Sequence, residues 1–252
     1  MQAKISKPMN QNSLIHNRDG ERLDVTFHGG IKMGVVVILG HGVTANKDRP
    51  LILAIADGLA ERGWPCIRFT FSGNGESEGR FEDSTITKEV GDLKSILKTV
   101  PQERRVAYIG HSMGAAVGVK VAAEDMAIQS LVSLAGMVDT RGFAEREFGA
   151  VPPDEGCMWE EPDCPLSSTF MNDLKQVGNV ISEAAKVQAP WLFIHGSDDD
   201  VVPIKDSRDA FSAASCEKEL IEIPQADHMF GKEHYPRIID AIDSWLRKCF
   251  GA

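Results

Sequence analysis

Two segments of the sequence match the pattern Gly-x-Ser-x-Gly, GESEG at residues 75–79 and GHSMG at residues 110–114. This pattern is typical of a serine nucleophile on a sharp turn between a β-strand and an α-helix. The turn strains the backbone and crowds the positions two residues either side of the serine, so both positions have to be very small. Ser77 and Ser112 are therefore both candidates for the nucleophile of an acyl-transfer reaction.

The sequence around each serine favours Ser112. VAYI (residues 106–109) is typical of a buried strand, and GHSMG runs directly into small helix-forming residues, AAVGVKVAAE (115–124). The N-terminus of such a helix directs free N–H groups towards a developing negative charge. Around Ser77, glycines and polar residues follow the strand and no helix begins, so we interpret that segment as a flexible surface turn.

A serine nucleophile needs a histidine base, and the histidine needs a carboxylate to orient it. His228, in IPQADHMF, follows the last predicted strand and lies at the edge of the sheet towards which Ser112 points. His41 and His195 each stand in a His-Gly pair at the end of a strand, where a structural role in the turn is expected. His111 is expected to face away from Ser112, and His234 to be a solvated residue at the start of the last helix.

The acid candidates are the three aspartates at 198–200, in HGSDDDVVP (195–203), directly after a predicted strand. Active groups of open α/β sheets gather at the carboxyl ends of the strands. Consecutive aspartates point in different directions, so they indicate no chelating cluster, and we predict no metal site. Asp227 is a rival, but it adjoins His228 and is poorly placed to bond the ring of its own neighbour. The expected chain order is Ser112, one of the three aspartates, then His228.

The backbone N–H groups of two loops are expected to bind the oxyanion formed during acyl transfer. Met113, the residue after the candidate nucleophile, supplies one of them. The other is expected from the loop that follows the strand VVVIL, in GHGVTANKD (40–48).

The elements that must hold these residues alternate between strand and helix along the chain. Near-continuous apolar strands separated by helical patterns predict an α/β fold, a mostly parallel sheet with helices on both faces. An earlier run, Arg22–His28, alternates in polarity and suits an antiparallel edge strand. The predicted strands are residues 34–39, 64–71, 104–110, 128–136, 189–196 and 218–224, and the predicted helices include 50–63, 85–101, 115–124 and a closing helix around 238–246.

One segment, at about residues 137–187, interrupts this alternation because it is acidic, rich in prolines and too long for a connecting loop. We interpret it as a small inserted cap with short helices on a single domain that comprises residues 1–252. Its large apolar side chains either line an apolar pocket for the acyl group or pack the cap onto the domain; they are Phe143, Phe148, Trp159, Phe170 and Met171.

The bulk properties exclude several classes of protein. A formal net charge of −10 disfavours binding to nucleic acid or to an anionic membrane, because both usually need a basic face. The apolar runs are of strand length, and the N-terminal segment MQAKISKPMNQNSL has no apolar signal core. Five scattered cysteines without a Cys-x-x-Cys spacing indicate neither a disulfide framework nor a zinc site. We therefore expect a cytoplasmic protein.

Together these motifs resemble the α/β-hydrolase superfamily. The likeness is greatest to small serine esterases of the cinnamoyl or feruloyl type and to serine-aminopeptidase-like hydrolases. The segments that carry it are HGVTANKD, FSGNGESEG, GHSMG, HGSDDDVVP and ADHMF. The resemblance implies that the acid is Asp199, the fourth residue after the histidine of its His-Gly pair. It also implies that the second oxyanion donor is the N–H of Val43, which stands where feruloyl-cleaving members often carry an aromatic residue.

The expected activity is that of a serine hydrolase that cleaves a small-molecule carboxylic ester through an acyl-enzyme, with Ser112, Asp199 and His228 as catalytic residues and no cofactor. A thioesterase, a monoacylglycerol lipase or a peptidase would use the same residues. A binding protein with the same fold and no catalysis is the alternative from another class. The sequence leaves the oligomeric state open.

Overall fold

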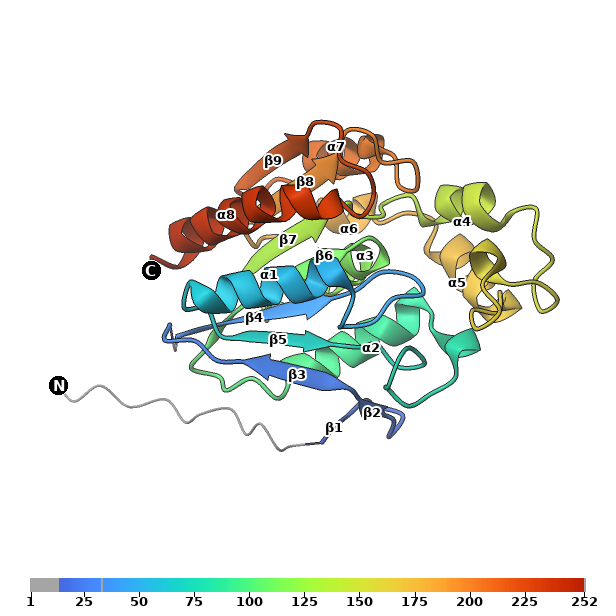
Figure 1. Ribbon diagram of the computed structural model, residues 1–252, viewed down its shortest axis with the longest axis horizontal. Coiled ribbons are helices and arrows are strands. Elements are labelled where there is room, and N and C mark those ends of the chain that lie inside the picture. Colours follow the sequence, from blue (N-terminus) through green and yellow to red (C-terminus); the bar gives the residue numbers. More distant parts are fainter. Residues whose placement is uncertain (1–13, 33, 252) are drawn as a thin grey trace.

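The computed structural model describes residues 14–32 and 34–251. Within these ranges the centre is a seven-stranded sheet in the order β3-β5-β4-β6-β7-β8-β9, as Figure 1 shows. All neighbouring strands are parallel except β3, which pairs antiparallel with β5 at one edge. The strands are β3 (Val25–His28), β4 (Val35–Gly40), β5 (Cys66–Phe69), β6 (Arg105–His111), β7 (Ser130–Leu134), β8 (Trp191–Gly196) and β9 (Lys218–Ile223).

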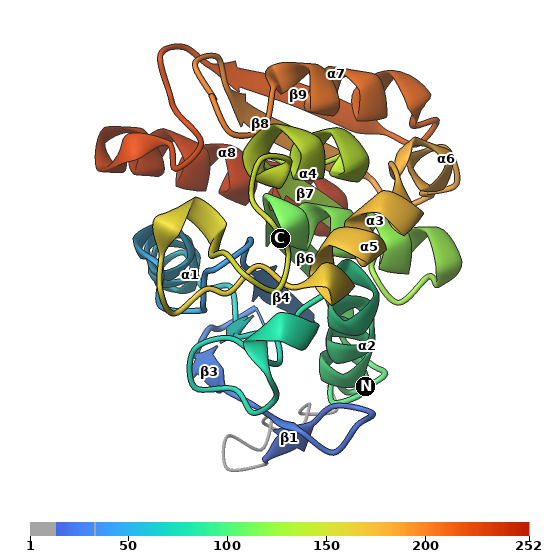
Figure 2. The same ribbon diagram turned by 90° about the vertical axis from the view of Figure 1, so that its right-hand side faces the viewer.

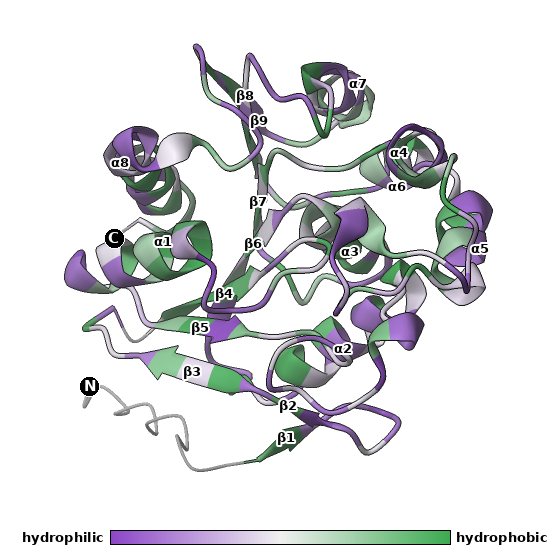
Figure 3. Ribbon diagram, turned by 45° about the vertical axis from the view of Figure 1, so that its right-hand side comes forward, coloured by the Kyte–Doolittle hydropathy of each residue, from purple (hydrophilic) through white to green (hydrophobic). Residues whose placement is uncertain are grey.

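Helices cover both faces of the sheet, and this is why the central strands are continuous apolar runs. One face is covered by α1 (Pro50–Glu61) and α8 (Gly231–Phe250), and the other by α2 (Ile86–Leu97), α3 (Met113–Glu124) and α7 (Ile204–Ala213). Every residue of β4 and β8 is buried. Figure 3 shows the outer side of α8 in the colours of polar residues, as expected for an amphipathic helix that packs one face on a core. The predicted α/β fold is confirmed.

Two elements differ from the sequence-based prediction. The run from Arg22 to His28 is divided at Asp24 into β2 (Arg22–Leu23) and β3, and β2 pairs with β1 (Ile15–His16) in a separate small sheet. Helix α7 was not among the predicted helices. It buries only Asp206, Ser207 and Ala210, so no apolar stripe marks it in the sequence.

The segment expected to form the cap lies between β7 and β8. Its helices are α4 (Thr140–Phe148), the short 3₁₀-helix η2 (Met158–Glu160), α5 (Ser168–Val177) and α6 (Ile181–Ala184). In Figures 1 and 2, α4 and α5 stand beyond the carboxyl ends of the parallel strands. Short helices therefore cover the edge of the sheet at which active groups are expected.

The N-terminal segment, the length of the helices and the cysteines bear on the expectations drawn from composition. The N-terminal segment that was read as lacking a signal core lies almost entirely in residues 1–13, outside the described ranges. No helix in the described part of the chain is both long and apolar enough to cross a bilayer. All five cysteines are free.

Candidate active site

Ser112 occupies a strained turn between β6 and α3. Its φ of 54° and ψ of −120° are outside the regions that residues with a side chain normally adopt. Three hydrogen bonds hold this conformation: the Ser112 N–H donates to the Leu134 carbonyl at 2.9 Å, and the Ser112 carbonyl accepts from the N–H groups of Ala115 (3.0 Å) and Met137 (3.1 Å). A strained residue held this firmly is a common feature of functional sites.

The glycines around Ser112 allow three backbone segments to meet. A Cβ on Gly110 would lie 2.4 Å from the Gly114 carbonyl oxygen, and a Cβ on Gly114 would lie 2.4 Å from that of His41. A Cβ on Gly42 would lie 2.8 Å from the Cβ of Ser112. The crowding inferred from the Gly-x-Ser-x-Gly pattern is thus present, and it brings the loop after β4 against the serine.

Ser77 has a structural role instead. Its side chain is buried, and its hydroxyl donates to the Thr70 carbonyl at 2.7 Å and accepts from the Asp24 N–H at 2.8 Å. The segment is a turn in which most residues are exposed, as interpreted, but Ser77 itself is buried and its hydroxyl joins two backbone segments inside the protein. Among the described residues, the partners of this hydroxyl are these two backbone groups and not a histidine.

Asp199 is held by four donors in the turn after β8. Its Oδ1 accepts the N–H groups of Val201 (3.0 Å) and Val202 (2.8 Å). Its Oδ2 accepts His228 Nδ1 at 2.9 Å and His195 Nε2 at 3.1 Å. The side chain is completely buried, so these four contacts fix its position.

The ionisation of Asp199 follows from the same contacts. Burial alone would raise the pKa of its carboxyl group. The hydrogen bonds from His195 and His228, the charge on His228 and the Val202 N–H outweigh burial and hold this pKa well below its usual range. Asp199 is therefore a buried carboxylate anion that faces an imidazole N–H.

The other acid candidates are in different environments. Asp198 is exposed and accepts the Ser197 hydroxyl at 2.7 Å. Asp200 is exposed at the rim of the pocket, and Asp227 accepts the Met229 N–H at 3.0 Å. In the described residues, Asp199 is the acid that the structure brings onto the ring of His228.

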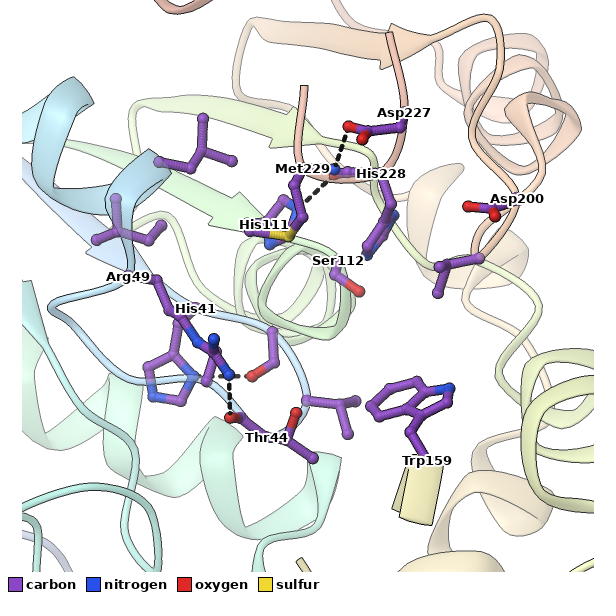
Figure 4. Close-up of a pocket in the computed structure, with 16 residues that line it drawn as sticks. His41, Thr44, Arg49, His111, Ser112, Trp159, Asp200, Asp227, His228 and Met229 are labelled. Carbon is purple, nitrogen blue, oxygen red and sulfur yellow. Dashed lines mark hydrogen bonds between the residues drawn. The ribbon is translucent and has the colours of Figure 1, made fainter. Parts of the chain in front are cut away.

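Ser112 and His228 line the same cavity, which has a volume of about 430 Å³. Figure 4 shows the far end of the His228 ring beside the Ser112 side chain. Because Asp199 binds the ring at Nδ1, the other ring nitrogen, Nε2, is left on the side of the cavity. This arrangement allows a proton to pass between the Ser112 hydroxyl and Nε2 of His228, while the Nδ1–H of the same ring is held by Asp199.

Two histidines support this arrangement, and sequence reasoning missed both roles. The His111 ring packs on the His228 ring with centroids 4.9 Å apart, and its Nε2–H donates to the His228 carbonyl at 3.0 Å. Burial, with the charge of His228, lowers the pKa of His111 to about 3, so it is neutral. For His195 only a structural role in the turn after its strand was expected, but its ring also contacts Asp199. Its Nδ1 lies 2.7 Å from the Ser207 hydroxyl.

His41 has the structural role that was predicted for it. Its Nδ1–H donates to the Gly42 carbonyl at 2.8 Å, and its Nε2 accepts the Phe71 N–H at 3.0 Å. Burial lowers its pKa to about 4 against the effect of the Gly42 bond, so the ring is neutral. This ring fixes the loop that carries Val43.

Two backbone N–H groups beside Ser112 have no acceptor among the described residues. Met113 is the first residue of α3, where an N–H has no partner within the helix. Val43 follows Gly42, whose backbone packs against Ser112, and it lines the cavity. Both N–H groups are thus available to a ligand atom.

The large apolar residues of the cap have different roles. Only Trp159 lines the 430 Å³ cavity, whereas the other four are buried in packing. Phe148 is at the centre of this packing, with ring centroids 4.9 Å from Trp159, 5.7 Å from Phe143 and 6.3 Å from Phe170. Of the two readings left open by the sequence, packing therefore holds for all but Trp159. No cluster of His, Cys, Asp or Glu with the geometry of a metal site occurs in the described ranges.

The comparisons with known proteins concern the family and the fold of the chain. Residues 35–156 match the profile of the alpha/beta hydrolase fold family, and residues 165–234 match that of the serine aminopeptidase S33 family. The chain belongs to the α/β-hydrolase superfamily. The predicted membership is confirmed.

The proteins that this chain resembles include a palmitoyl-protein thioesterase and a protein whose structure was solved with ferulic acid bound. Human palmitoyl-protein thioesterase ABHD10, a mitochondrial protein, is 26% identical over 87% of this chain and 74% of its own length. The structure of Est1E from Butyrivibrio proteoclasticus with ferulic acid superimposes with a TM-score of 0.84 at 22% identity, covering 95% of this chain and all of Est1E. Mouse ABHD10 gives 0.79 at 20% identity, with coverages of 94% and 98%. At these identities the structures show a shared fold.

Proposed function

We propose that this protein is a serine hydrolase that cleaves carboxylic esters, with Ser112, His228 and Asp199 as its catalytic triad. The observation that carries the proposal is the hydrogen bond to the buried Asp199 from His228, which lines the same cavity as the strained Ser112. Along the chain the nucleophile Ser112, the acid Asp199 and the base His228 follow in the order typical of this superfamily.

In the first half of the reaction, the Ser112 hydroxyl attacks the acyl carbon of the ester while its proton passes to Nε2 of His228. Asp199 accepts the Nδ1–H of His228, which keeps Nε2 free to act as a base and stabilises the imidazolium cation that forms. The tetrahedral intermediate then releases the alcohol, which takes the proton from Nε2. The acyl group remains on Ser112.

In the second half, a water molecule attacks the acyl-enzyme and gives a proton to His228. Release of the carboxylic acid returns that proton to Ser112. The N–H groups of Val43 and Met113 bind the oxyanion in both halves, which is supported by their lack of another acceptor beside Ser112. Oxyanion donors typically contribute about 10²–10³ to kcat.

We also propose how the chain is organised, which partner it has and where in the cell it acts. Residues 1–252 form a single domain with a cap at about 137–187, and the cap contributes Trp159 to the substrate cavity. The partner is a small ester, and the formal net charge of −10 disfavours nucleic acid as a partner. We propose a cytoplasmic location, which rests on the five free cysteines and their scattered spacing.

The likeness to two kinds of relative supports two candidate substrate classes. The fold of Est1E, solved with ferulic acid, supports an aromatic ester of the cinnamoyl or feruloyl type. The relationship to palmitoyl-protein thioesterase ABHD10 supports a thioester as the second candidate. Hydrolysis rates for an oxygen ester and a thioester of the same acyl group distinguish them, with the higher kcat/KM identifying the class.

Labelling with a fluorophosphonate probe, followed by peptide mapping, tests the chemistry. We expect the label on Ser112, and loss of labelling in Ser112→Ala and His228→Ala. Ser77→Ala is the matched control, since it removes the serine of the other Gly-x-Ser-x-Gly segment, and it should still be labelled. A folded protein that takes no label would refute the hydrolase and favour a binding protein. A label on Ser77 would refute the choice of nucleophile.

A further inference from the structure

The walls of the active-site cavity differ in charge from one side to the other. Figure 4 shows Arg49 on the wall formed by the loop between β4 and α1, whereas Trp159 and Asp200 are on the opposite side of Ser112. Asp227 lies above Ser112 in the same view. An ester with its carbonyl at Ser112 therefore has one end on the side of a cation, Arg49, and the other on the side of a carboxylate, Asp200.

Arg49 is the permanent cation among the residues that line this cavity. Its Nη2 donates to the Thr44 carbonyl at 3.0 Å, which holds the side chain on the cavity wall. A guanidinium group has five N–H donors, so most of them are available. Although the chain has a formal net charge of −10, none of the described carboxylates forms an ion pair with Arg49.

The other titratable groups around the cavity do not neutralise Arg49. Burial holds the pKa of His41 at about 4 and, together with His228, that of His111 at about 3, so both rings are uncharged. Asp227 accepts the Met229 N–H above Ser112 in Figure 4, and Asp200 is exposed on the side opposite Arg49. The positive charge of Arg49 is thus unopposed on its own wall.

We propose that Arg49 forms an anion-binding subsite and that the ester cleaved at Ser112 carries a carboxylate on the part that lies towards Arg49. The inference rests on the proposed function and specifies its substrate class. A guanidinium group binds a carboxylate through two parallel N–H···O bonds. Asp200 repels an anion from the opposite side of Ser112, so attraction and repulsion select the same orientation.

Two pairs of esters test the subsite and identify which part of the substrate carries the charge. In the first pair, 4-nitrophenyl hydrogen adipate is compared with 4-nitrophenyl methyl adipate, so that the carboxylate is in the acyl part. In the second pair, 4-carboxyphenyl acetate is compared with 4-carbamoylphenyl acetate, so that it is in the alcohol part. Each ratio of kcat/KM, charged to neutral, is measured for the original protein, Arg49→Gln and Arg141→Gln.

Arg141→Gln is the matched control. Arg141 is also exposed and donates its Nη2 to a carbonyl, that of Lys175 at 2.9 Å, but it lies in the cap and does not line the cavity. We expect Arg49→Gln to lower the charged-to-neutral ratio of one pair by about tenfold, equivalent to about 1.4 kcal/mol. Arg141→Gln should leave both ratios unchanged. Added salt should also lower the ratio in the original protein, because it screens the charge of Arg49.

The pair of esters whose charged-to-neutral ratio falls in Arg49→Gln shows whether the carboxylate belongs to the acyl or the alcohol part of the substrate. If Arg49→Gln leaves the ratio unchanged in both pairs, the inference is overturned. Equal losses on charged and neutral esters would also overturn it, because Arg49 would then act only by supporting the loop at Thr44. The proposed function fails separately, if Ser112→Ala retains hydrolysis. Hydrolysis that needs Ser112 but shows no dependence on Arg49 refutes the subsite alone.

Discussion

Replacing Asp199 with Asn tests the geometry of the site most directly. The carboxylate accepts four hydrogen bonds, two at each oxygen, and all four partners are N–H donors. An amide presents one oxygen and one NH₂ group. Whichever way it is turned, its NH₂ group meets donors, either the backbone of Val201 and Val202 or the rings of His195 and His228.

The consequence for His228 is a change of tautomer. With an NH₂ group opposite, Nδ1 of His228 accepts a hydrogen bond instead of donating one, and the proton moves to Nε2. The ring then has no lone pair for the Ser112 proton. We expect kcat to fall by about 10⁴, the loss known for this substitution in serine proteases, which corresponds to about 5.5 kcal/mol in the activation barrier.

Stability should change as well. In the original protein the pKa of Asp199 is lowered, so its carboxylate stabilises the folded state above its unfolded pKa, and this contribution is lost as the pH falls through the folded pKa. Asn has no such titration. Asp199→Asn should therefore be less stable at neutral pH, by about 1–3 kcal/mol for the unpaired donors, and the difference should shrink in acid.

The assay is the hydrolysis of 4-nitrophenyl acetate at saturating concentration, with circular dichroism to verify folding. Asp198→Asn is the matched control, because Asp198 is the preceding aspartate, is exposed and does not line the cavity. It should change kcat by less than twofold. A folded Asp199→Asn protein that loses less than tenfold, or an Asp198→Asn protein that loses more, would refute the assignment.

Three further predictions concern residues around the site. Ser77→Ala leaves the Asp24 N–H and the Thr70 carbonyl unpaired, so urea unfolding should show a loss of about 1–3 kcal/mol, and an unchanged midpoint would contradict the structural role. Glu89 is fully buried without a partner for either carboxyl oxygen among the described residues, and burial, with Asp92 and Asp173, raises its pKa well above the usual range. A group whose pKa is raised in the folded protein stabilises the fold below its unfolded pKa, and this stabilisation is lost as the pH rises to the folded pKa. Between these two pKa values the free energy of unfolding should therefore fall by about 1.4 kcal/mol per pH unit, and Glu89→Gln should remove this slope. Parallel slopes for the original protein and the variant in urea unfolding would contradict the prediction. Trp159→Ala removes the ring that the cap contributes to the cavity, so the ratio of kcat/KM between long and short 4-nitrophenyl esters should change more than threefold, whereas equal losses on both would speak against a role in acyl selection.

The features predicted correctly from the sequence are those that local physical chemistry determines. Near-continuous apolar runs of strand length that alternate with helical patterns favour strands covered on both faces, and this predicts the parallel sheet. Glycines at 110 and 114 are required by the crowding around Ser112, so the strained turn is predicted by these five residues together with the strand before them and the helix after them. Helix α7 escaped prediction because its buried face is small and polar.

The tertiary structure decided the contacts between residues far apart in the chain. His111 supports His228 across 117 positions, and Ser77 joins Asp24 to Thr70, although a glycine-rich segment is typical of an exposed turn. Four of the five apolar residues in the cap pack against their neighbours, a choice that depends on how the cap lies over the sheet. No sequence motif singles out Arg49, which lies on the cavity wall because the loop after β4 turns it there, without an ion pair among the described residues. A sequence pattern reflects the interactions of a residue with its neighbours along the chain, whereas the burial of a side chain and its hydrogen-bond partners depend on which distant segments the fold brings together.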